Sequence, residues 1–327
     1  MEKVCIVGAG AIGGYLGAKL ALAGVAQVSA LARGATLAAL HTQGWRLRED
    51  GSLRHAEVHA SDDPAALGVQ DLVIVAVKGP ALAGVCAALP PLLGPHTIVL
   101  PAMNGVPWWF GQGVAALGDA PLRSIDPDGR IGATIALPRV LGGVVHLAAS
   151  CPEPGLVEHR MGRALIVGEP AGGTSERAAR AVALLRAAGL DASESADIRR
   201  EVWFKLWGNL TINPVTAITG ATADRVLDDP LVRGFCSAAM REAAVLGARL
   251  GCAIEQSPED RHAVTRKLGA FRSSMLQDVQ AGRPIELDAI VGVVHELSQR
   301  LGVPTPTIDA LFGLARLFGR VHGLYPD

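Results

Sequence analysis

The chain is poor in aromatic side chains, which make up 4% of its 327 residues, and neither sign of charge predominates. Lysine plus arginine number 30 and aspartate plus glutamate number 31, so the formal net charge is -1. A nucleic-acid-binding protein needs a basic face that neutralises phosphates, and this balance argues against that class. We therefore expect no nucleic-acid partner.

Long apolar runs are also missing, although half of the residues are apolar. No stretch reaches the ~18 consecutive apolar residues that a membrane span needs. The first residues, MEKVCIVGAGAIGG, lack the basic segment and unbroken apolar segment of a signal peptide. These features predict a cytoplasmic protein without a membrane partner.

Cysteines are few and scattered, at positions 5, 86, 151, 236 and 252. None forms a C-x-x-C pair, and no histidine stands at the spacing of a zinc site. We expect these thiols to be small buried side chains in a reducing compartment, with no metal site and no disulfide framework.

The first part of the chain alternates short apolar runs with helical stretches, which predicts β-α-β units and a doubly wound parallel sheet. The expected strands are Lys3–Val7, Val28–Ala32, Asp71–Val77 and Thr97–Leu100, and the expected helices are Ala11–Ala23, Thr36–Thr42 and Ala81–Leu89. Further on, the pattern indicates a surface loop over Leu117–Gly132, then short antiparallel or edge strands at Val144–Ala148, Gly155–His159 and Ala164–Val167, a helix at Ser175–Ala188 and a last strand at Leu190–Glu194.

Beyond Asp197 only helical periodicity remains, in Ile198–Ile212, Pro230–Leu250, Pro258–Lys267, Asp288–Leu301 and Thr307–Val321. The sequence therefore predicts an N-terminal Rossmann-type α/β domain at 1–196 and an all-α domain at 197–327. The sequence leaves a homodimer open, since the apolar helix faces are needed for the core of the domain itself.

A glycine-rich turn follows the first expected strand and opens a helix. It consists of Gly8, Ala9, Gly10, Ala11, Ile12 and Gly13 and matches G-x-G-x-x-G. The first glycine allows a tight turn, the second lets the backbone approach a pyrophosphate, and the third permits close packing of helix on strand. In this strand-turn-helix context the motif predicts a dinucleotide site, with the anion at a helix N-terminus.

The residues after the second expected strand favour NADP(H). An NAD site usually has an acidic residue about 20 positions after the glycines, but no acid occurs between Glu2 and Glu49. Arg33 stands there instead and can pair with a 2′-phosphate, unless it is an ordinary solvated arginine. Lys78, at the end of the third strand, adds positive charge at the same edge.

Three polar residues share one face of the helix around Val202–Asn213. Lys205, Asn209 and Asn213 are four residues apart and are flanked by apolar side chains. Such a stripe is often only the solvated face of a helix. Asparagine is a poor helix former, however, so a functional stripe is an equally good interpretation.

A second polar segment lies at residues 273–288. Ser273 or Ser274 could cap a helix, and Asp288 could cap the next one. Glu286, between Ile285 and Leu287, has no such structural explanation.

These blocks together resemble the ketopantoate reductase (2-dehydropantoate 2-reductase) family. The resemblance lies in GAGAIGG at 8–14, MNGV at 103–106, KLWGNLTINPVTAITG at 205–220 and SSMLQDVQAGRPIELDAI at 273–290. It implies a Rossmann domain followed by a helical domain like the C-terminal domain of 6-phosphogluconate dehydrogenase, with the active site in the cleft between them. The implied activity is NADPH-dependent reduction of 2-dehydropantoate to (R)-pantoate, a step of pantothenate biosynthesis.

The same resemblance assigns roles to individual residues. It implies that Lys205 is the general acid that protonates the ketone oxygen, that Glu286 holds the substrate hydroxyl and that Ser274 holds the carboxylate end. Asn209 and Asn213 would position the substrate, and Asn104 would lie beside the nicotinamide and Lys205. Arg33 and Lys78 match family positions near the adenosine phosphate.

Several positions depart from the family pattern, namely Met103, Val291, Ile308 and the aromatic segment at 107–110, together with the long 117–132 loop. These departures bear on which 2-keto acid is the substrate, and Trp108 and Trp109 could either reshape the pocket wall or pack within their loop. Two other functions stay open: an NAD(P)-linked D-2-hydroxyacid dehydrogenase that acts on a bulkier substrate, and a non-catalytic NADP-binding sensor. Retention of both Lys205 and Glu286 argues against the sensor.

Overall fold

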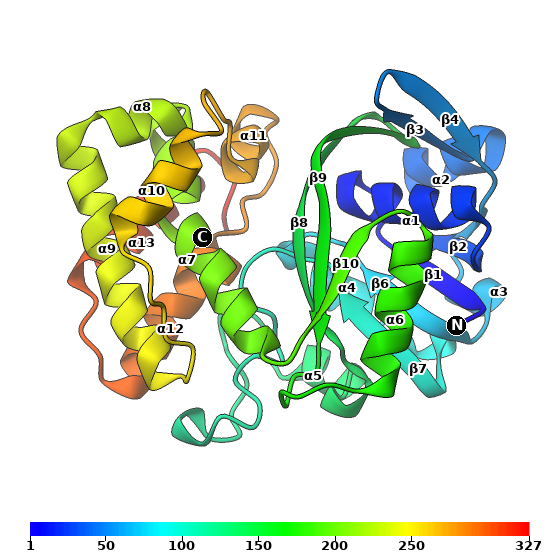
Figure 1. The fold of residues 1–327 in the computed structure, drawn as a ribbon, viewed down its shortest axis with the longest axis horizontal. Coiled ribbons are helices and arrows are strands. Elements are labelled where there is room, and N and C mark those ends of the chain that lie inside the picture. Colours follow the sequence, from blue (N-terminus) through cyan, green and yellow to red (C-terminus); the bar gives the residue numbers. More distant parts are fainter. Residues whose placement is uncertain (327) are drawn as a thin grey trace. The chain divides into compact units, whose positions relative to one another are not determined.

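The computed structural model describes residues 1–326 and divides into two units (Figure 1). The first unit comprises residues 1–103 and 130–201, and the second comprises residues 104–129 and 202–327. No helix within the described part of the chain is long and apolar enough to cross a membrane.

The first unit contains a five-stranded parallel sheet. Its strands are β1 (Lys3–Val7), β2 (Gln27–Leu31), β5 (His59–Ser61), β6 (Gln70–Val75) and β7 (Leu93–Pro101), in the order β5-β2-β1-β6-β7. The order reverses between β1 and β6, which is the switch point at which doubly wound sheets bind ligands. The predicted doubly wound parallel sheet is confirmed.

Helices alternate with these strands, and the sequence pattern predicted all of them except the short α3. They are α1 (Ala11–Ala23), α2 (Gly34–Gln43), α3 (Pro64–Leu67) and α4 (Gly79–Cys86), followed by the 3-10 turn η1 (Pro90–Leu92). The central strands are buried on both faces, so they consist of continuous apolar residues and not of an alternating pattern.

A second sheet completes the first unit. It consists of β3 (Trp45–Glu49), β4 (Ser52–Ala56), β8 (Gly142–Glu153), β9 (Leu156–Gly168) and β10 (Asp191–Ser195). In the chain, α5 (Arg130–Thr134) and η3 (Leu137–Arg139) precede β8, and α6 (Glu176–Ala187) lies between β9 and β10. The three short strands expected at 144–167 form one long hairpin, β8–β9, because the ladder continues through polar residues that the apolar pattern misses. The β3–β4 hairpin was not predicted, since β4 is mostly exposed and carries polar side chains.

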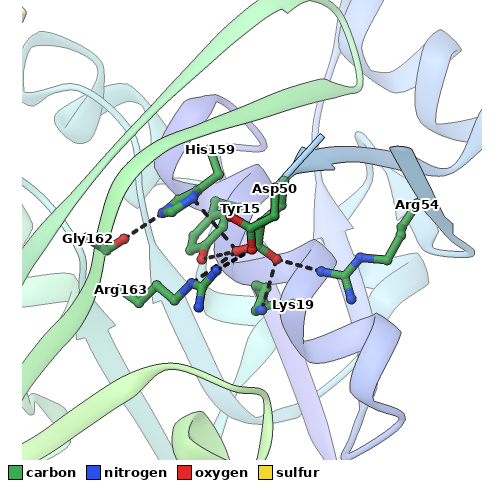
Figure 2. A network of polar contacts seen from close by, with 8 residues as sticks. Tyr15, Lys19, Asp50, Arg54, His159, Gly162 and Arg163 are labelled. Atoms are coloured by element: carbon green, nitrogen blue, oxygen red, sulfur yellow. Dashed lines mark hydrogen bonds and ion pairs between the residues drawn. The ribbon is translucent and has the colours of Figure 1, made fainter. Parts of the chain in front are cut away.

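A polar network joins α1 to this second sheet (Figure 2). The carboxylate of Glu49, 5% exposed on β3, accepts a hydrogen bond from the Tyr15 hydroxyl at 2.9 Å. Lys19 on the same helix lies 3.2 Å from the second carboxylate oxygen, and Arg54 from β4 lies 2.6 Å from it. Arg163 of β9 approaches the first oxygen at 3.3 Å. One buried carboxylate thus links a helix and three strands.

The second unit is helical, and this prediction is also confirmed. Its helices are α7 (Ile198–Thr219), which begins in the first unit, α8 (Ala223–Asp228), α9 (Pro230–Arg249), α10 (Pro258–Arg266), α11 (Ser274–Gln280), the π-helical turn η4 (Asp288–Gly292), α12 (Val293–Leu301) and α13 (Pro306–Val321). Two tryptophans of α7 anchor α9: the indole of Trp203 donates to the Ala243 carbonyl and that of Trp207 to the Met240 carbonyl.

The segment 104–129, with the 3-10 turn η2 (Ala115–Leu117), groups with the helical unit, whereas the predicted division placed it in the first domain. Side chains of the helical unit explain the difference. Glu296 of α12 accepts hydrogen bonds from the backbone N–H groups of Arg123 and Ser124, and Phe110 stacks on Trp203 with ring centroids 5.9 Å apart. The predicted surface loop is therefore tied to α12.

Candidate active site

A cavity of about 310 Å³ lies at the carboxyl edge of the parallel sheet in the first unit. It is lined by the ends of β1 and β2, the glycine-rich turn and one side of α4; the lining residues are Val7, Gly8, Ala9, Gly10, Leu31, Ala32, Arg33, Thr36, Asp62, Val77, Ala81, Gly84, Val85 and Ala88. This is the edge at which dinucleotides bind in sheets of this topology.

The three glycines of the turn have different surroundings. Gly8 adopts φ +94°, in the region that favours glycine. A Cβ on Gly13 would collide with the carbonyl oxygen of Gly8, so only glycine allows α1 to begin this close to β1. A Cβ on Gly10 would meet nothing within 4 Å, so the backbone there faces open space. Ala11 and Ile12 form the first turn of α1.

One side of the cavity is basic. Arg33 is exposed, lines the cavity and precedes α2, whose first turn contains no acidic residue. Thr36 in that turn also lines the cavity. Lys78 is exposed at the N-terminus of α4, between the lining residues Val77 and Ala81.

Sequence reasoning did not identify Asp62 as a lining residue. It follows β5, which has only three residues and gives no recognisable strand pattern. Its carboxylate is exposed and shares the cavity with Arg33. The cavity therefore contains an acidic residue, although none follows β2 directly.

The second unit holds the polar stripe of α7. Lys205 and Asn209 are half-buried and Asn213 is 5% exposed. The Lys205 ammonium donates a hydrogen bond to Oδ1 of Asn104 at 2.9 Å, which joins residues 101 positions apart.

The electrostatic environment of Lys205 makes it a better acid than a free lysine. Burial lowers the pKa of Lys205 to about 8, and the negative charge of Glu286 opposes that decrease. Glu286 is itself buried, at 7% exposure. The structure therefore places a lysine and a carboxylate close enough for the charge of one to affect the pKa of the other.

The Asn104 turn is held by backbone contacts with η4. Gly105 has φ +80°, and a Cβ there would collide with the backbone of Ala289. The N–H of the next residue, Val106, donates to the Ala289 carbonyl at 2.8 Å. The asparagine that contacts Lys205 is thus fixed by the turn that follows Glu286.

The two serines at the start of α11 occupy different positions. Ser273 is the N-cap: its hydroxyl accepts from the Leu276 N–H at 3.1 Å and lies 2.7 Å from the hydroxyl of Thr216 on α7. Ser274 is the first helical residue and is half-buried. Asp288, which the sequence offered as a cap, instead accepts a hydrogen bond from Tyr325.

Four of the residues that depart from the family pattern belong to the core of the helical unit, whereas Met103 is half-buried and belongs to the first unit. Trp108, Trp109, Val291 and Ile308 are at most 2% exposed. Of the two interpretations of the tryptophan pair, packing within the unit is the one that this burial supports.

A doubly wound sheet with a glycine-rich turn, joined to a helical unit with a lysine-glutamate pair, defines an NAD(P)-dependent oxidoreductase that acts on CH–OH groups. Two family models match the chain, Ketopantoate reductase PanE/ApbA over residues 4–172 and its C-terminal counterpart over residues 197–318. The chain belongs to the ketopantoate reductase family.

Relatives of known name agree with this assignment. A 2-dehydropantoate 2-reductase of Mesorhizobium japonicum is 43% identical over 99% of both chains. The crystal structure of a proposed ketopantoate reductase from Ralstonia solanacearum is 57% identical, with a TM-score of 0.95 over 99% of this chain and 100% of that one. A D-mandelate dehydrogenase with NADH and anilino(oxo)acetate has a TM-score of 0.83 over 98% of this chain and 99% of that one; at 20% identity it shows the shared fold alone.

Proposed function

We propose that the protein reduces a 2-keto acid to the 2-hydroxy acid with NADPH, with 2-dehydropantoate as the substrate and Lys205 as the general acid. The observation that carries the proposal is the half-buried Lys205 ammonium, held by Asn104 at 2.9 Å and facing the charge of Glu286. The 43% identity to a relative named for this reaction supports the choice of substrate.

The residues that line the cavity of the first unit suit a dinucleotide that carries a 2′-phosphate, such as NADPH. The open space at Gly10 lets backbone N–H groups at the start of α1 approach a pyrophosphate. Arg33, Thr36 and the first turn of α2 would receive a 2′-phosphate, because a guanidinium, a hydroxyl and free N–H groups all donate to it. When bound, the nicotinamide supplies the hydride that reduces the carbonyl carbon.

Lys205 would neutralise the negative charge that reduction places on the ketone oxygen. The ketone oxygen becomes negative as its carbon is reduced, and an ammonium at hydrogen-bond distance stabilises that charge and then donates its proton. A free lysine has a pKa near 10.4 and holds its proton tightly. With the pKa lowered to about 8, Lys205 is still protonated at pH 7 but releases its proton more readily.

The remaining polar residues are assigned to substrate binding. Glu286 would accept a hydrogen bond from the substrate hydroxyl, and Ser274 would donate to the carboxylate. Asn209 and Asn213 lie one and two helical turns beyond Lys205 on α7, so their amides face the same side as the ammonium.

A panel of 2-keto acids tests the proposal. Each acid is incubated with the protein and NADPH, and the loss of nucleotide absorbance is followed. We expect 2-dehydropantoate to give the highest kcat/KM. A preference for an aryl or long-chain keto acid would instead identify a different member of the family, and NADPH binding without turnover of any acid would favour the sensor.

The presence of Asp62 in the cavity favours a second function, that of an NAD-linked D-2-hydroxyacid dehydrogenase. Its carboxylate lines the same cavity as Arg33 and would repel a 2′-phosphate while accepting a hydrogen bond from a neutral ribose or adenine. Titration with both nucleotides separates the two functions. Tighter binding of NADPH supports the reductase, and tighter binding of NADH supports the dehydrogenase.

A further inference from the structure

The segment that follows α13 contacts residues on both sides of Glu286, the backbone of one and the carboxylate of the other. Ile285, one residue before it, donates its N–H to the Leu324 carbonyl at 3.0 Å. Asp288, two residues after it, accepts a hydrogen bond from the Tyr325 hydroxyl at 2.7 Å. Residues 324 and 325 therefore fix the chain on both sides of Glu286.

Residues 324 and 325 are themselves well packed. Leu324 is 6% exposed, and its N–H donates to the Gly319 carbonyl at 2.7 Å. Tyr325 lies against Gly319, where an added Cβ would come within 2.7 Å of the tyrosine Cβ. The guanidinium of Arg320 lies 6.0 Å from the centre of the tyrosine ring. The Tyr325 hydroxyl is thus held in place by α13.

Asp288 connects this contact with the rest of the site. It begins η4, and π-helical turns often occur at functional sites because they shift a side chain out of helical register. Burial raises the pKa of Asp288, and the hydrogen bond from Tyr325 counteracts that increase. The next residue, Ala289, accepts the hydrogen bond from Val106 that fixes the Asn104 turn.

We propose that Tyr325 is a positioning residue that acts through Asp288 to hold Glu286 toward Lys205 and the substrate hydroxyl. This inference rests on the proposed substrate-binding role of Glu286. Tyr325 touches neither nucleotide nor substrate in this account, and no bond forms or breaks at its ring. Nothing in the family resemblance or the names of the relatives assigns it a role.

The first test is the Tyr325→Phe variant, which keeps the ring packing and removes only the hydroxyl. We expect KM for the keto acid to rise about tenfold, with kcat within twofold and the Kd of NADPH unchanged. Ser237→Ala is the matched control, because Ser237 also donates a hydroxyl to a carboxylate, that of Glu259, at 2.8 Å. The inference is wrong if Tyr325→Phe changes KM no more than Ser237→Ala does.

The second test separates positioning from general destabilisation. If Tyr325 acts through Glu286, the Tyr325→Phe change should add nothing to KM in a Glu286→Gln background. Coupled residues behave in this way, whereas independent ones give additive effects. An additive increase in KM would contradict the inference.

The third test needs no substrate and remains decisive if the proposed reaction is wrong. Protein labelled with ¹³C at the lysine Cε is titrated by NMR, with the Lys205→Arg variant identifying the signal among those of Lys3, Lys19, Lys78 and Lys267. Because Glu286 raises the pKa of Lys205, Tyr325→Phe should move that pKa below about 8. An unchanged Lys205 titration would overturn the inference, whereas wild-type protein inactive on every keto acid would overturn the proposed function alone.

Discussion

Arg33 is the residue on which the proposed preference for NADPH depends. Its guanidinium lines the cavity beside the first turn of α2, where a phosphate can also accept from backbone N–H groups. We predict that Arg33→Ala raises KM for NADPH by roughly 10- to 100-fold, because charge-assisted hydrogen bonds are each worth about 1.5–3 kcal/mol. KM for NADH should change less than threefold.

Steady-state kinetics with both nucleotides checks this prediction. Arg160→Ala is a suitable control, since Arg160 is an exposed arginine of the same unit that pairs with Glu158 outside the cavity. Equal losses with NADPH and NADH would mean that Arg33 does not contact the 2′-phosphate.

Asp62 should weaken the binding of NADPH, whereas Arg33 should strengthen it. Neutralising it with Asp62→Asn removes a repulsive charge from the cavity while preserving the shape of the side chain. We expect the Kd of NADPH to fall about two- to fivefold at low salt and the difference to shrink as salt screens the charge. Fluorescence titration at two ionic strengths checks this, and weaker NADPH binding would show that Asp62 contacts the nucleotide favourably.

The placement of candidate site residues could be predicted from sequence where local spacing defines it. The stripe of Lys205, Asn209 and Asn213 follows from helical periodicity alone. The hydrogen bond between Lys205 and Asn104 could be expected only from a family resemblance, because it joins distant positions. The positions of Asp62 and Tyr325 gave no local signal, since their neighbours are set by tertiary packing.

At the scale of elements, the Glu49 network holds α1, whose N-terminus adjoins the proposed nucleotide cavity, against the second sheet. His159 adds to it by stacking on Tyr15 with ring centroids 4.9 Å apart (Figure 2). Burial acts to raise the pKa of Glu49, but hydrogen bonds from Tyr15 and Lys19 and the charge of Arg163 outweigh it. The net effect is a pKa below the usual range.

This shift predicts a pH-dependent loss of stability. A carboxyl with a lowered pKa in the folded state stabilises the protein above its unfolded pKa, about 4.3 for glutamate, and loses that contribution as the pH falls. Glu49→Gln should therefore lower the free energy of unfolding at pH 7 by about 3 kcal/mol, the lower end of the range for removing one partner of a buried pair, because Arg54 and Arg163 are partly exposed.

Urea unfolding at pH 7 and pH 3.5 measures both effects. The difference between wild type and Glu49→Gln should narrow at the lower pH. Glu176→Gln is the control, since Glu176 forms an exposed pair with Arg180 and should change stability little at either pH. A difference that is independent of pH would show that the charge of Glu49 is not what stabilises the network.

Element types were predictable where the hydrophobic pattern is strong. Buried parallel strands and amphipathic helices have clear patterns, so the central sheet and the long helices agree with expectation. The β3–β4 hairpin, the short strand β5 and the π-helical turn lack such patterns. The hairpin depends on the pairing of β3 with β9, and β5 depends on its pairing with β2. The π-helical turn η4 depends on contacts with residues far along the chain.

For the whole molecule, the nucleotide should act as a stabilising ligand. A ligand at 100 times its Kd stabilises the folded state by about 2.7 kcal/mol. With an unfolding entropy of about 2.1 cal/mol/K per residue, 327 residues give an increase in Tm of about 4 °C. We expect this increase with NADPH, and a smaller one with the same concentration of NADH.

Differential scanning fluorimetry measures the shift, with Arg33→Ala as the control variant. The increase in Tm with NADPH should fall in that variant to the value seen with NADH. A larger shift with NADH than with NADPH in the wild-type protein would contradict the assigned nucleotide preference.

The division of the chain shows what the sequence can and cannot define at this scale. The change from mixed to purely helical periodicity near residue 197 could be read directly. The grouping of residues 104–129 with the helical unit could not, because it depends on Glu296 and Trp203, far along the chain.

The most direct test of the account is the pH dependence of keto-acid reduction by wild type and Lys205→Arg. The proposed acid must be protonated to act, and the pKa of Lys205 is about 8, so kcat of the wild type should fall as the pH rises above about 8. Arginine keeps the positive charge but does not release its proton at these pH values, so Lys205→Arg should lose at least about 100-fold in kcat and show no such decline. A Lys205→Arg enzyme within tenfold of wild type, with the same decline in kcat, would contradict Lys205 as the acid.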